Sequence, residues 1–457
     1  VRMGINPDGF SWKLENGEKF DTPEAILCHS TSGLTALSQN MHSFINNHII
    51  RGKYKNKTRP VLLNSWEACY FGFNEERLIK IAECSAKLGI ELLVIDDGWF
   101  GKRDSDNCSL GDWVVDKRKL PGGIEAIHDV LKKHGMTLGI WFEPEMVSPD
   151  SDLYRAHPDW CLHIDGRPRS EGRQQLMLNL SRKEVCDYLY DSIAAVLKNG
   201  AISYVKWDFN RNMSEVGSTD LPADRQQEVS HRYYLGLYSL LERLVTDFPD
   251  VLFESCSGGG GRFDCGMLYY MPQTWTSDNS DAIERLPIQH GTSLVYPLSS
   301  MSAHVSASPN HQTGHVTPFD TRFNVAFTGS FGYELDPTAL SEEEQSLVRR
   351  TAEFYKKYSH VAANGRYFRL RSCYEGDCAA WEYISDDDSI CIAEYVLTHV
   401  RVYPHYERLK LKGLDPDARY RDDSGNQYTG SELMGYGIPV DLTYEYSSKM
   451  WVLEKIK

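Results

Sequence analysis

The chain has 457 residues, of which 41% are hydrophobic and 25% are charged, and a formal net charge of −15. The length predicts two or three structural units with ample core, and the composition excludes a disordered or fibrous protein. The acidic balance argues against nucleic acid as a partner, and no apolar run reaches the roughly 18 residues that span a bilayer, so we expect no membrane partner either. Neutral small molecules remain compatible ligands.

The eleven cysteines are scattered singly along the chain and show no CxxC spacing. This usage favours a reducing compartment, and we expect a cytoplasmic protein. The chain begins with Val1, and residues 4–15, GINPDGFSWKLE, indicate a strand segment without preceding partners. We therefore expect an N-terminal truncation, with which any signal peptide would have been lost.

Residues 1–52 are predicted to be the tail of a domain and a connecting helix. A strand is expected around Phe10 to Leu14. Apolar side chains then recur at helical spacing, at Leu34, Leu37, Met41, Phe44, Ile45 and Ile49. The basic, turn-rich RGKYKNKTRP precedes the next unit.

Residues 53–362 alternate between strand and helix patterns, which is typical of parallel βα units. Helices are expected over residues 74–88, 122–134, 182–198 and 225–247. Eight strands would close a (β/α)8 barrel, and they are expected at residues 61–65, 92–95, 137–141, 202–207, 251–254, 274–277, 294–296 and 323–327.

Residues 363–457 show a different pattern of apolar and turn-forming residues. Short apolar runs such as YFRLRS, CAAWEYIS, SICIAEYVL, VRVYPHYERLKLKGL and MWVLEKIK are separated by turn clusters such as SDDDS and DDSGN. Short strands with local turns and no helix pattern predict a C-terminal antiparallel β-sandwich.

Six of the expected barrel strands end in acidic, aromatic or small polar clusters: LLNSWEA, ELLVIDDGW, TLGIWFEPE, ISYVKWDFN, VLFESCSGG and QTWTSDN. A (β/α)8 barrel builds its catalytic mouth from residues at the carboxyl ends of its strands. The mouth is therefore expected to hold Asp96, Asp97, Glu145, Asp208 and Asp278 together with several tryptophans. Such a composition is typical of a sugar-cleaving site.

The motif KWDFNRN, residues 206–212, supplies the first candidate catalytic group. Asp208 closes a strand, and Lys206 lies two positions earlier on the same face. A cation in reach favours the ionised carboxylate that a nucleophile requires, and Asn210 can hydrogen-bond a ligand hydroxyl. An ordinary ion pair inside the barrel is about equally compatible with the motif taken alone.

The motif WTSDNSDAIERL, residues 275–286, supplies the second. Asp278 follows an expected strand, whereas Asp281 stands where a capping residue would precede the helix AIERL. We assign Asp278 to chemistry and Asp281 to capping. Carboxyl groups about 5 Å apart cleave a glycosidic bond with retention and groups about 6.5 to 9.5 Å apart with inversion, so the sequence leaves the stereochemistry open.

In VIDDGWF, residues 94–100, two adjacent aspartates can both reach a ligand only if the backbone turns, which Gly98 permits. Paired carboxylates can accept hydrogen bonds from neighbouring sugar hydroxyls. The rival interpretation is a Mg²⁺ site made by Asp96 and Asp97 with Glu143 and Glu145. Since no histidine with ligand spacing accompanies them, we expect no metal and no cofactor.

Tryptophans at strand ends, Trp66, Trp99 and Trp141, can stack on a pyranose or pack in the core. Arg173 can contact a substrate oxygen or pair with a nearby aspartate. In SCSGGGGRFDCG, residues 255–266, the glycines lack the GKS or GKT of a phosphate loop and more plausibly let backbone approach a ligand, with Cys256 as a small polar wall.

The motifs VIDDGWF, IWFEPEMVSP, KWDFNRN, FESCSGGGGRFD and TWTSDNSDAIERL, in this order, closely resemble those of the family 36 glycoside hydrolases, the microbial α-galactosidases. They resemble the family 27 enzymes more distantly. The resemblance covers essentially the whole chain. It implies a barrel, a C-terminal β-sandwich and, in full-length members, a large N-terminal β-domain that helps to assemble tetramers, of which residues 1 to about 30 would be the last remnant.

Carried over residue by residue, the resemblance implies that Asp208 is the nucleophile and Asp278 the acid/base, with Asp96 and Asp97 on the 4-hydroxyl and 6-hydroxyl of galactose. Further lining residues of the galactose pocket would be Trp66, Trp141, Arg173, Lys206, Asn210, Cys256 and Gly258. The implied activity is retaining, exo-acting hydrolysis of galactosides such as melibiose, raffinose and stachyose, together with transglycosylation.

Three other functions are considered. A galactosyl transferase of the raffinose-synthase type would use the same residues with a sugar acceptor in place of water. A carbohydrate-binding protein on an inactive barrel is disfavoured because both candidate aspartates are present. A Mg²⁺-dependent lyase would be sensitive to a chelator.

Overall fold

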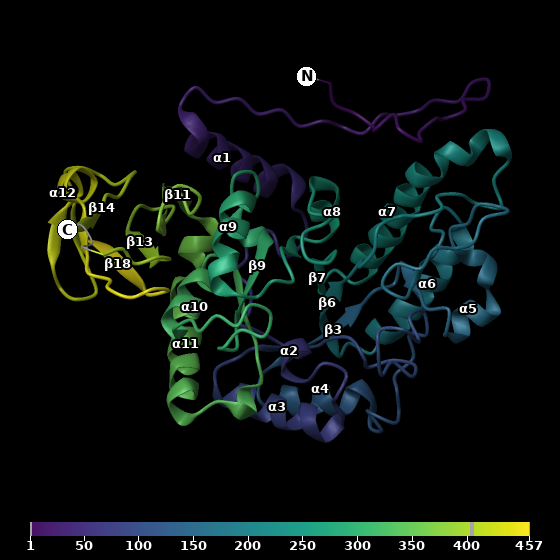
Figure 1. The fold of residues 1–457 in the computed structure, drawn as a ribbon, viewed down its shortest axis with the longest axis horizontal. Coiled ribbons are helices and arrows are strands. Elements are labelled where there is room, and N and C mark those ends of the chain that lie inside the picture. The colour runs from purple at the N-terminus through teal and green to yellow at the C-terminus, as the bar shows by residue number, and fades with distance from the viewer. Residues whose placement is uncertain (1, 403–405, 457) are drawn as a thin grey trace.

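Eight short parallel strands close into a barrel, which confirms the predicted architecture (Figure 1). The computed structural model describes residues 2–402 and 406–456. Around the barrel the strands follow the order β1-β10-β9-β8-β7-β6-β3-β2, and Leu62 of β1 pairs with both Leu92 and Gly332. The strands are β1 Leu62–Asn64, β2 Leu92–Ile95, β3 Thr137–Phe142, β6 Ile202–Trp207, β7 Leu252–Ser255, β8 Gln273–Trp275, β9 Met301–Ser306 and β10 Ser330–Glu334.

Helices follow the strands and cover the barrel. Their starts carry the expected signals: the Asn74 side chain accepts a hydrogen bond from the Arg77 N–H at the start of α3, and Asp281 caps α9 by accepting from Ile283 and Glu284. The helices are α2 Trp66–Cys69, α3 Glu75–Lys87, α4 Gly123–Lys133, α5 Asp152–Ala156, α6 Lys183–Leu197, α7 Val229–Asp247, α8 Cys265–Tyr270, α9 Ala282–Thr292, α10 Phe319–Phe327 and α11 Glu342–Asn364. Shorter pieces are β4 Met146–Val147, β5 Leu176–Met177 and the 3₁₀ turns η2 Pro158–Trp160, η3 Ala223–Glu228, η4 Leu298–Ser300 and η5 Pro337–Ala339.

The predicted positions of the last two barrel strands are wrong. Residues 294–296 form turns after α9, and the seventh strand is β9; residues 323–327 belong to helix α10, and the eighth strand is β10. Eight of the nine residues of α10 are buried, because this helix lies between the barrel and the C-terminal sheet. A helix buried on nearly all sides shows no helical periodicity, so a short apolar run cannot be distinguished from a strand.

An extended segment and a helix precede the barrel. The helix α1 Gly33–Phe44 continues into a π-helical turn, η1 Ile45–Ile49, which confirms the predicted helix. The strand expected around Phe10 to Leu14 is wrong, since these residues join no β-ladder. Instead Phe10 and Trp12 pack against His231 of α7, with ring centroids 6.0 and 5.4 Å away.

The C-terminal part is an antiparallel sheet of order β11-β12-β13-β18-β15-β16 with a smaller pair, β14-β17. Leu409 of β14 and Ile438 of β17 share a core with Cys391 and Ala393 of β13, so the small pair forms a second layer of the predicted sandwich. One short helix, α12 Gly430–Gly435, was not expected. The strands are β11 Arg366–Arg371, β12 Cys378–Ile384, β13 Ile390–Leu397, β14 Glu407–Leu409, β15 Arg419–Arg421, β16 Gln427–Thr429, β17 Ile438–Val440 and β18 Ser448–Ile456.

The expected run VRVYPHYERLKLKGL spans residues 400–414. Residues 403–405 of this run lie outside the described residues, and its described remainder contains β14.

The sheet meets the barrel helices through a face that contains a buried carboxyl group. Trp381, Tyr383 and Ile392 on this face join the main core, and the Tyr383 hydroxyl donates to Thr328 Oγ1 at 2.9 Å. Glu394, two positions after Ile392, is fully buried, and neither of its carboxyl oxygens has a hydrogen-bond partner among the described residues. Burial therefore holds the pKa of Glu394 well above its ordinary range, so the group is kept protonated in the fold.

Replacing Glu394 with glutamine should stabilise the protein increasingly as the pH rises. An acid whose pKa is raised on folding loses stability as the pH climbs above its unfolded pKa, by at most about 1.4 kcal/mol per pH unit. The free energy of unfolding of Glu394→Gln, measured between pH 5.5 and 9, should exceed that of the wild type by an amount that grows with pH.

Glu382 on the other face provides a matched control for this titration. Burial raises the pKa of Glu382 to about 8. The difference in free energy of unfolding between Glu382→Gln and the wild type should therefore stop growing near that pH. A pH-independent gap for Glu394→Gln would contradict the assignment of Glu394 as a buried titrating acid.

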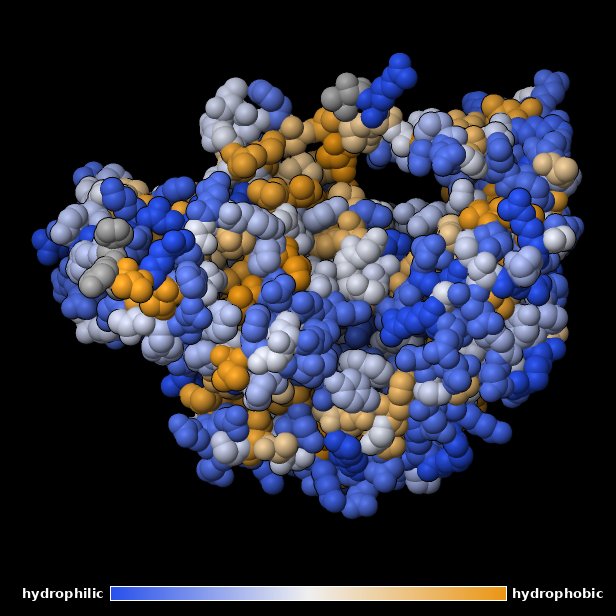
Figure 2. Space-filling view, in the orientation of Figure 1, coloured by the Kyte–Doolittle hydropathy of each residue, from blue (hydrophilic) through white to orange (hydrophobic). Residues whose placement is uncertain are grey.

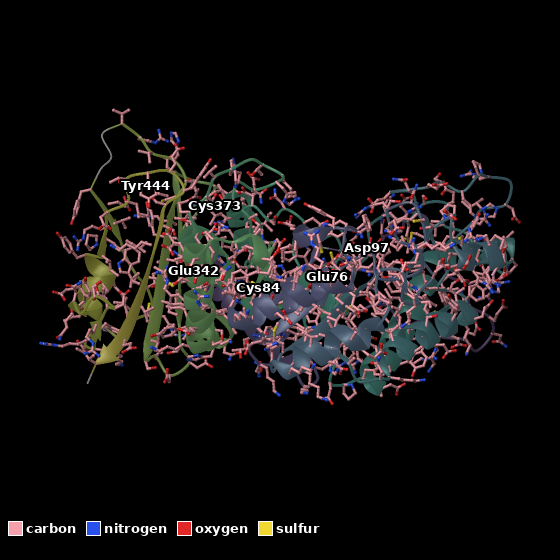
Figure 3. All side chains as sticks on the ribbon, turned by 90° about the horizontal axis from the view of Figure 1, so that it is seen from below. Glu76, Cys84, Asp97, Glu342, Cys373 and Tyr444 are labelled. Atoms are coloured by element: carbon pink, nitrogen blue, oxygen red, sulfur yellow. The ribbon has the colours of Figure 1, made fainter. Side chains whose placement is uncertain are left out.

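The surface is mainly hydrophilic in Figure 2, and hydrophobic side chains gather around the N-terminal segment and α1. Among the helices of the described chain, none combines the length and the apolar character that crossing a bilayer demands. In Figure 3, Asp97 lies in the barrel, and Tyr444 lies in the C-terminal domain, in the connection between β17 and β18. That connection also reaches the loop after β9, where the Tyr446 ring lies 5.2 Å from the ring of His315.

Candidate active site

A cavity of about 200 Å³ opens at the carboxyl ends of the barrel strands. Its volume lies below the roughly 300 to 1,000 Å³ that drug-sized ligands occupy, so one sugar unit is the scale of ligand that it encloses. The lining side chains are mainly acidic, aromatic and basic. They are Trp66, Glu67, Asp96, Asp97, Trp141, Arg173, Lys206, Asp208, Asn210, Trp275, Asp278, His311, Gln312 and Glu334.

Asp208 directly follows β6 and is buried in this cavity. Its backbone N–H donates to the carbonyl of Phe142 on the neighbouring strand, at 2.7 Å. The carboxylate accepts two hydrogen bonds: Oδ1 from the Phe209 N–H at 2.9 Å and Oδ2 from Trp141 Nε1 at 3.1 Å. These donors fix the orientation of the carboxylate before any ligand arrives.

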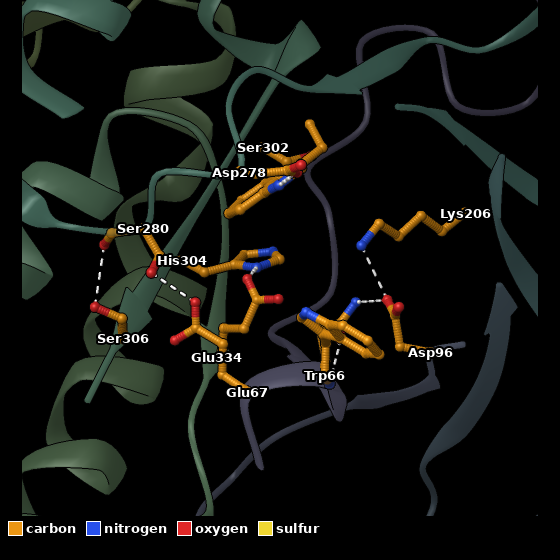
Figure 4. Close-up of polar contacts among 12 residues, drawn as sticks. Trp66, Glu67, Asp96, Lys206, Asp278, Ser280, Ser302, His304, Ser306 and Glu334 are labelled. Atoms are coloured by element: carbon orange, nitrogen blue, oxygen red, sulfur yellow. Dashed lines mark hydrogen bonds and ion pairs between the residues drawn. The ribbon is translucent and has the colours of Figure 1, made fainter. Parts of the chain in front are cut away.

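Lys206 does not pair with Asp208, which corrects the ion pair considered from the sequence. Its Nζ donates to Asp96 Oδ2 at 2.9 Å, and both groups are buried (Figure 4). Asp208 lies beyond the last residue of β6, where the alternation of a strand no longer decides which side chains share a face. Lys206 therefore acts on Asp208 through its charge and on Asp96 by direct contact.

Asp278 lies three residues beyond β8 and reaches the same cavity. Its Oδ1 accepts a hydrogen bond from Trp275 Nε1 at 3.1 Å. Burial, followed by the negative charge of Asp208, raises the pKa of Asp278, so this carboxyl group retains its proton to higher pH than an exposed aspartate. Asp281 caps α9 and also accepts from Thr313 Oγ1, as expected for a structural residue.

Asp96 and Asp97 both line the cavity because the backbone turns at Gly98, which has φ 109°. Asp96 Oδ2 also accepts from Asn64 Nδ2 at 2.7 Å. Asp97 forms a buried bidentate pair with Arg103, with Nε–Oδ1 at 3.0 Å and Nη2–Oδ2 at 2.8 Å. Both carboxylates are thus held in place by cations or amides and still present oxygen atoms to the cavity.

For galactose, the ligand that the family resemblance implies, replacing Asp96 with asparagine should weaken binding by about 10- to 150-fold, because a charged hydrogen bond contributes about 1.5 to 3 kcal/mol. Titration calorimetry with galactose provides the measurement. Asp129→Asn on the exposed face of α4 is the matched control and should bind galactose like the wild type. An unchanged affinity for Asp96→Asn would remove Asp96 from the binding site.

The remaining predicted residues separate into two groups. Trp66, Trp141, Arg173 and Asn210 line the cavity together with the groups described above. Cys256 and Gly258 are not among its lining residues. The Gly258 N–H donates to Asn210 Oδ1 at 3.2 Å, and Gly258 itself is exposed, so it contacts a lining residue from the solvent side.

Cys256 and Trp99 are both buried behind the lining residues. Burial, followed by the charges of Asp208 and Asp278, holds the pKa of the Cys256 thiol well above its usual range, which disfavours a thiolate nucleophile. Trp99 packs in the core and donates from Nε1 to the Trp141 carbonyl at 2.8 Å, which keeps that strand end in place.

The carboxylates considered for a metal are each engaged by protein donors. Glu145 accepts from both Arg262 guanidinium nitrogens at 2.7 and 2.9 Å, and also from Trp207 and Tyr233. Glu143 Oε1 accepts from the Asn210 N–H and from Gln175 Nε2, each at 2.7 Å. Burial, followed by the charge of Asp208, raises the pKa of Glu143 to about 8. No cluster of three or more metal-binding side chains occurs in the described part of the chain.

Sequence reasoning did not identify five of the lining residues. Trp275 precedes Asp278 in the same motif, and Glu67 follows Trp66 in LLNSWEA, so both lay within motifs already selected. Glu334 ends β10, the strand whose position was predicted wrongly. His311 and Gln312 belong to the loop after β9, and no strand-end signal marks them.

Comparison with known families agrees with the barrel and its cavity. A model described as melibiase matches residues 19–365, and a model of the glycosyl hydrolase family 36 C-terminal domain matches residues 378–453. A mouth of paired aspartates on a (β/α)8 barrel is the arrangement of a glycoside hydrolase. The chain belongs to the melibiase family, glycoside hydrolase family 36.

Individual relatives extend over the whole chain. The α-galactosidase AgaA of Geobacillus stearothermophilus is 51% identical over 458 residues, and the α-galactosidase Mel36A of Lactobacillus acidophilus is 47% identical over 459 residues. The crystal structure of AgaA superposes with a TM-score of 0.98 over 99% of this chain. Variants of AgaA have been solved in complex with raffinose and with stachyose. The chain spans 63% of AgaA and 62% of Mel36A.

Proposed function

We propose that this chain is the catalytic part of a retaining, exo-acting α-galactosidase. The observation that carries the proposal is the convergence of Asp208, Asp278 and the Asp96–Lys206 pair on one small cavity. Family membership and the raffinose and stachyose complexes of AgaA support terminal α-galactosides as substrates. The small volume of the cavity supports exo action, since only the terminal sugar would be enclosed.

In the proposed mechanism Asp278 donates its proton to the glycosidic oxygen while Asp208 attacks the anomeric carbon. The leaving sugar departs with that proton, and a β-linked galactosyl ester of Asp208 remains. Asp278, now ionised, removes a proton from water, and the resulting hydroxide displaces Asp208 and restores the α configuration. A sugar hydroxyl in place of water would give transglycosylation.

The electrostatics of the two aspartates support this division of roles. Asp278 is buried beside Asp208, and its raised pKa favours the protonated form that a general acid requires. The Asp208 carboxylate is already oriented by Trp141 and by the Phe209 N–H. For the glycone, we propose Asp96 and Asp97 as hydroxyl acceptors with Lys206, Arg173 and Asn210, and Trp66 and Trp141 as apolar walls, as the family resemblance implies.

Several wider assignments belong to the same proposal. The division into residues 1–52, 53–362 and 363–457 rests on the strand and helix patterns of the sequence, and the homotetramer of the full-length protein rests on the family resemblance. Cys256 would support the pocket as a buried residue beside Asp208, and Gly258 would hold the Asn210 side chain from the exposed side. A reducing, cytoplasmic location is supported by the cysteines, all eleven of which lie in the described residues and form no disulfide.

The test is hydrolysis by the purified chain of nitrophenyl α-galactoside and of raffinose, with the β-galactoside as control. We expect release of nitrophenol from the α-anomer only and release of galactose from raffinose. NMR of the first product should show α-galactose, as retention requires. Initial release of β-galactose would contradict the retaining mechanism, and inactivity on both substrates would contradict the proposed function.

A further inference from the structure

Glu67 connects the end of β1 to the loop that carries Asp278. It lies in the first turn of α2, directly after the mouth residue Trp66, and only 7% of its side chain is exposed. The Ser280 hydroxyl donates to Glu67 Oε1 at 2.6 Å, and Ser280 follows Asp278 by two residues (Figure 4). In the barrel β1 and β8 are separated by β10 and β9. The contact therefore joins the segments that follow two non-adjacent strands at the mouth.

The other side of the same loop is held by the segment after β9. Gln312 Nε2 donates to the Asp278 carbonyl at 2.9 Å, and its Oε1 accepts from the Ser280 N–H at 3.2 Å. Ser306 Oγ donates to the Ser280 carbonyl at 3.0 Å. Ser280 is thus held through its backbone by Gln312 and Ser306 and through its hydroxyl by Glu67, so Glu67 completes the set of contacts that fix the loop two residues after Asp278.

The second carboxyl oxygen of Glu67 is not used in the contact with Ser280. Glu67 Oε2 is buried without a hydrogen-bond partner in the described residues, and it lies 3.5 Å from His311 Nδ1 at the cavity. Buried carboxyl oxygens in a purely structural setting are normally paired, since an unpaired one is costly. At the cavity, Glu67 Oε2 is therefore within reach of a ligand hydroxyl or a water molecule as well as of His311.

Glu67 and Glu334 behave as a pair of neighbouring acids. Burial, followed by the charge of Glu334, raises the pKa of Glu67 to about 8. Burial alone would raise the pKa of Glu334, but the hydrogen bond to His304 at 3.2 Å and the charges of His304 and Lys206 lower it. At neutral pH the pair therefore holds one proton, on Glu67, and carries one negative charge. Figure 4 shows Glu67, Glu334 and His304 together, across the view from the Lys206–Asp96 pair.

We propose that Glu67 is a positioning residue that, through Ser280, holds Asp278 in line with the glycosidic oxygen of the leaving group. The inference rests on the proposed function, in which Asp278 is the general acid. Its consequence is a dependence on the leaving group. Cleavage of a sugar leaving group needs a well-placed proton, whereas nitrophenolate leaves with little protonation.

The experiment compares kcat/KM on raffinose and on nitrophenyl α-galactoside for Glu67→Ala, Glu67→Gln and Ser280→Ala. We expect Glu67→Ala and Ser280→Ala to lose about 10- to 100-fold on raffinose and about threefold or less on the aryl substrate. Glutamine resembles a protonated glutamate and retains an oxygen that accepts from Ser280, so Glu67→Gln should stay within about threefold of the wild type on both substrates.

A double variant and a surface control complete the design. If the two side chains act through one contact, Glu67→Ala combined with Ser280→Ala should lose no more than the worse single variant. Glu76→Ala on the exposed face of α3, whose side chain is 74% exposed, should match the wild type. Ser280→Ala keeps the test decisive if Glu67→Ala fails to fold.

Three results would overturn the inference. The first is an equal loss of kcat/KM on both substrates for Glu67→Ala or Ser280→Ala. The second is a Glu67→Gln variant that loses as much on raffinose as Glu67→Ala. The third is a double variant whose loss equals the sum of the two single losses in free energy. A wild-type protein inactive on both raffinose and nitrophenyl α-galactoside would instead refute the proposed function, so the two failures are distinguishable.

Discussion

Replacing Asp208 with glycine should lower kcat/KM on nitrophenyl α-galactoside by on the order of 10⁴-fold or more, because no other group can form the covalent intermediate. The structure supports this expectation. The carboxylate is held by Trp141 Nε1 and the Phe209 N–H, and Glu143, a buried acid near it, is hydrogen-bonded to Asn210 and Gln175. The measurement is the initial rate of nitrophenol release.

Azide should restore turnover in the same variant and identify the face of attack. Glycine leaves space where the carboxylate stood, and azide entering there would displace nitrophenol with inversion, since no galactosyl-enzyme forms. The expected product is β-galactosyl azide, detected by NMR. Recovery of the α-azide would contradict the assignment of Asp208 as the nucleophile, and Asp129→Asn, with its intact site, should yield no azide-dependent gain.

The barrel could be predicted from the sequence because six of its strands are short apolar runs closed by a polar cluster. Leu92–Ile95 and Ile202–Trp207 agree with the predicted bounds to the residue. The last two strands lack that contrast. Helix α10 is buried between two layers on nearly all sides although four of its nine residues are polar or charged, so it shows no polar helical face. The strand after it, Ser330–Glu334, includes a glycine and two aromatic residues in a run of five. Local pattern alone could not separate these two elements.

The site was predictable where a side chain follows its strand directly and less so where tertiary contacts decide. Asp208 and Asp96 directly follow β6 and β2, and both reach the cavity. The partner of Lys206 is Asp96, 110 positions away, which no local spacing indicates. Glu67 lies in a short helix beyond its strand, and its contact with Ser280 depends on how the barrel closes. Residues that orient the chemistry through loops are therefore the part that sequence patterns do not show.

Replacing Asp278 with alanine should have an effect that depends on the leaving group. For raffinose we expect kcat/KM to fall by about 10²- to 10⁴-fold, the usual contribution of a general acid, and for nitrophenyl α-galactoside by about tenfold or less. Asp281→Ala is a useful comparison because Asp281 caps α9 and lies in the same loop. Its main effect should be on stability, by about 1 kcal/mol. Equal losses of Asp278→Ala on the two substrates would contradict the acid/base assignment.

The pH dependence gives an independent test of the same residue. Burial and the charge of Asp208 raise the pKa of Asp278, so activity on raffinose that needs its proton persists at low pH and is lost as the pH rises through that pKa. In Asp278→Ala this alkaline fall should disappear from the residual activity. Glu67 and Glu143, with pKa values of about 8, titrate nearby, and the variants Glu67→Gln and Glu143→Gln separate their contributions from that of Asp278. If Asp278 is the acid, each glutamine variant retains an alkaline limb on raffinose that the alanine variant lacks, because only the loss of Asp278 removes the proton that the leaving sugar requires.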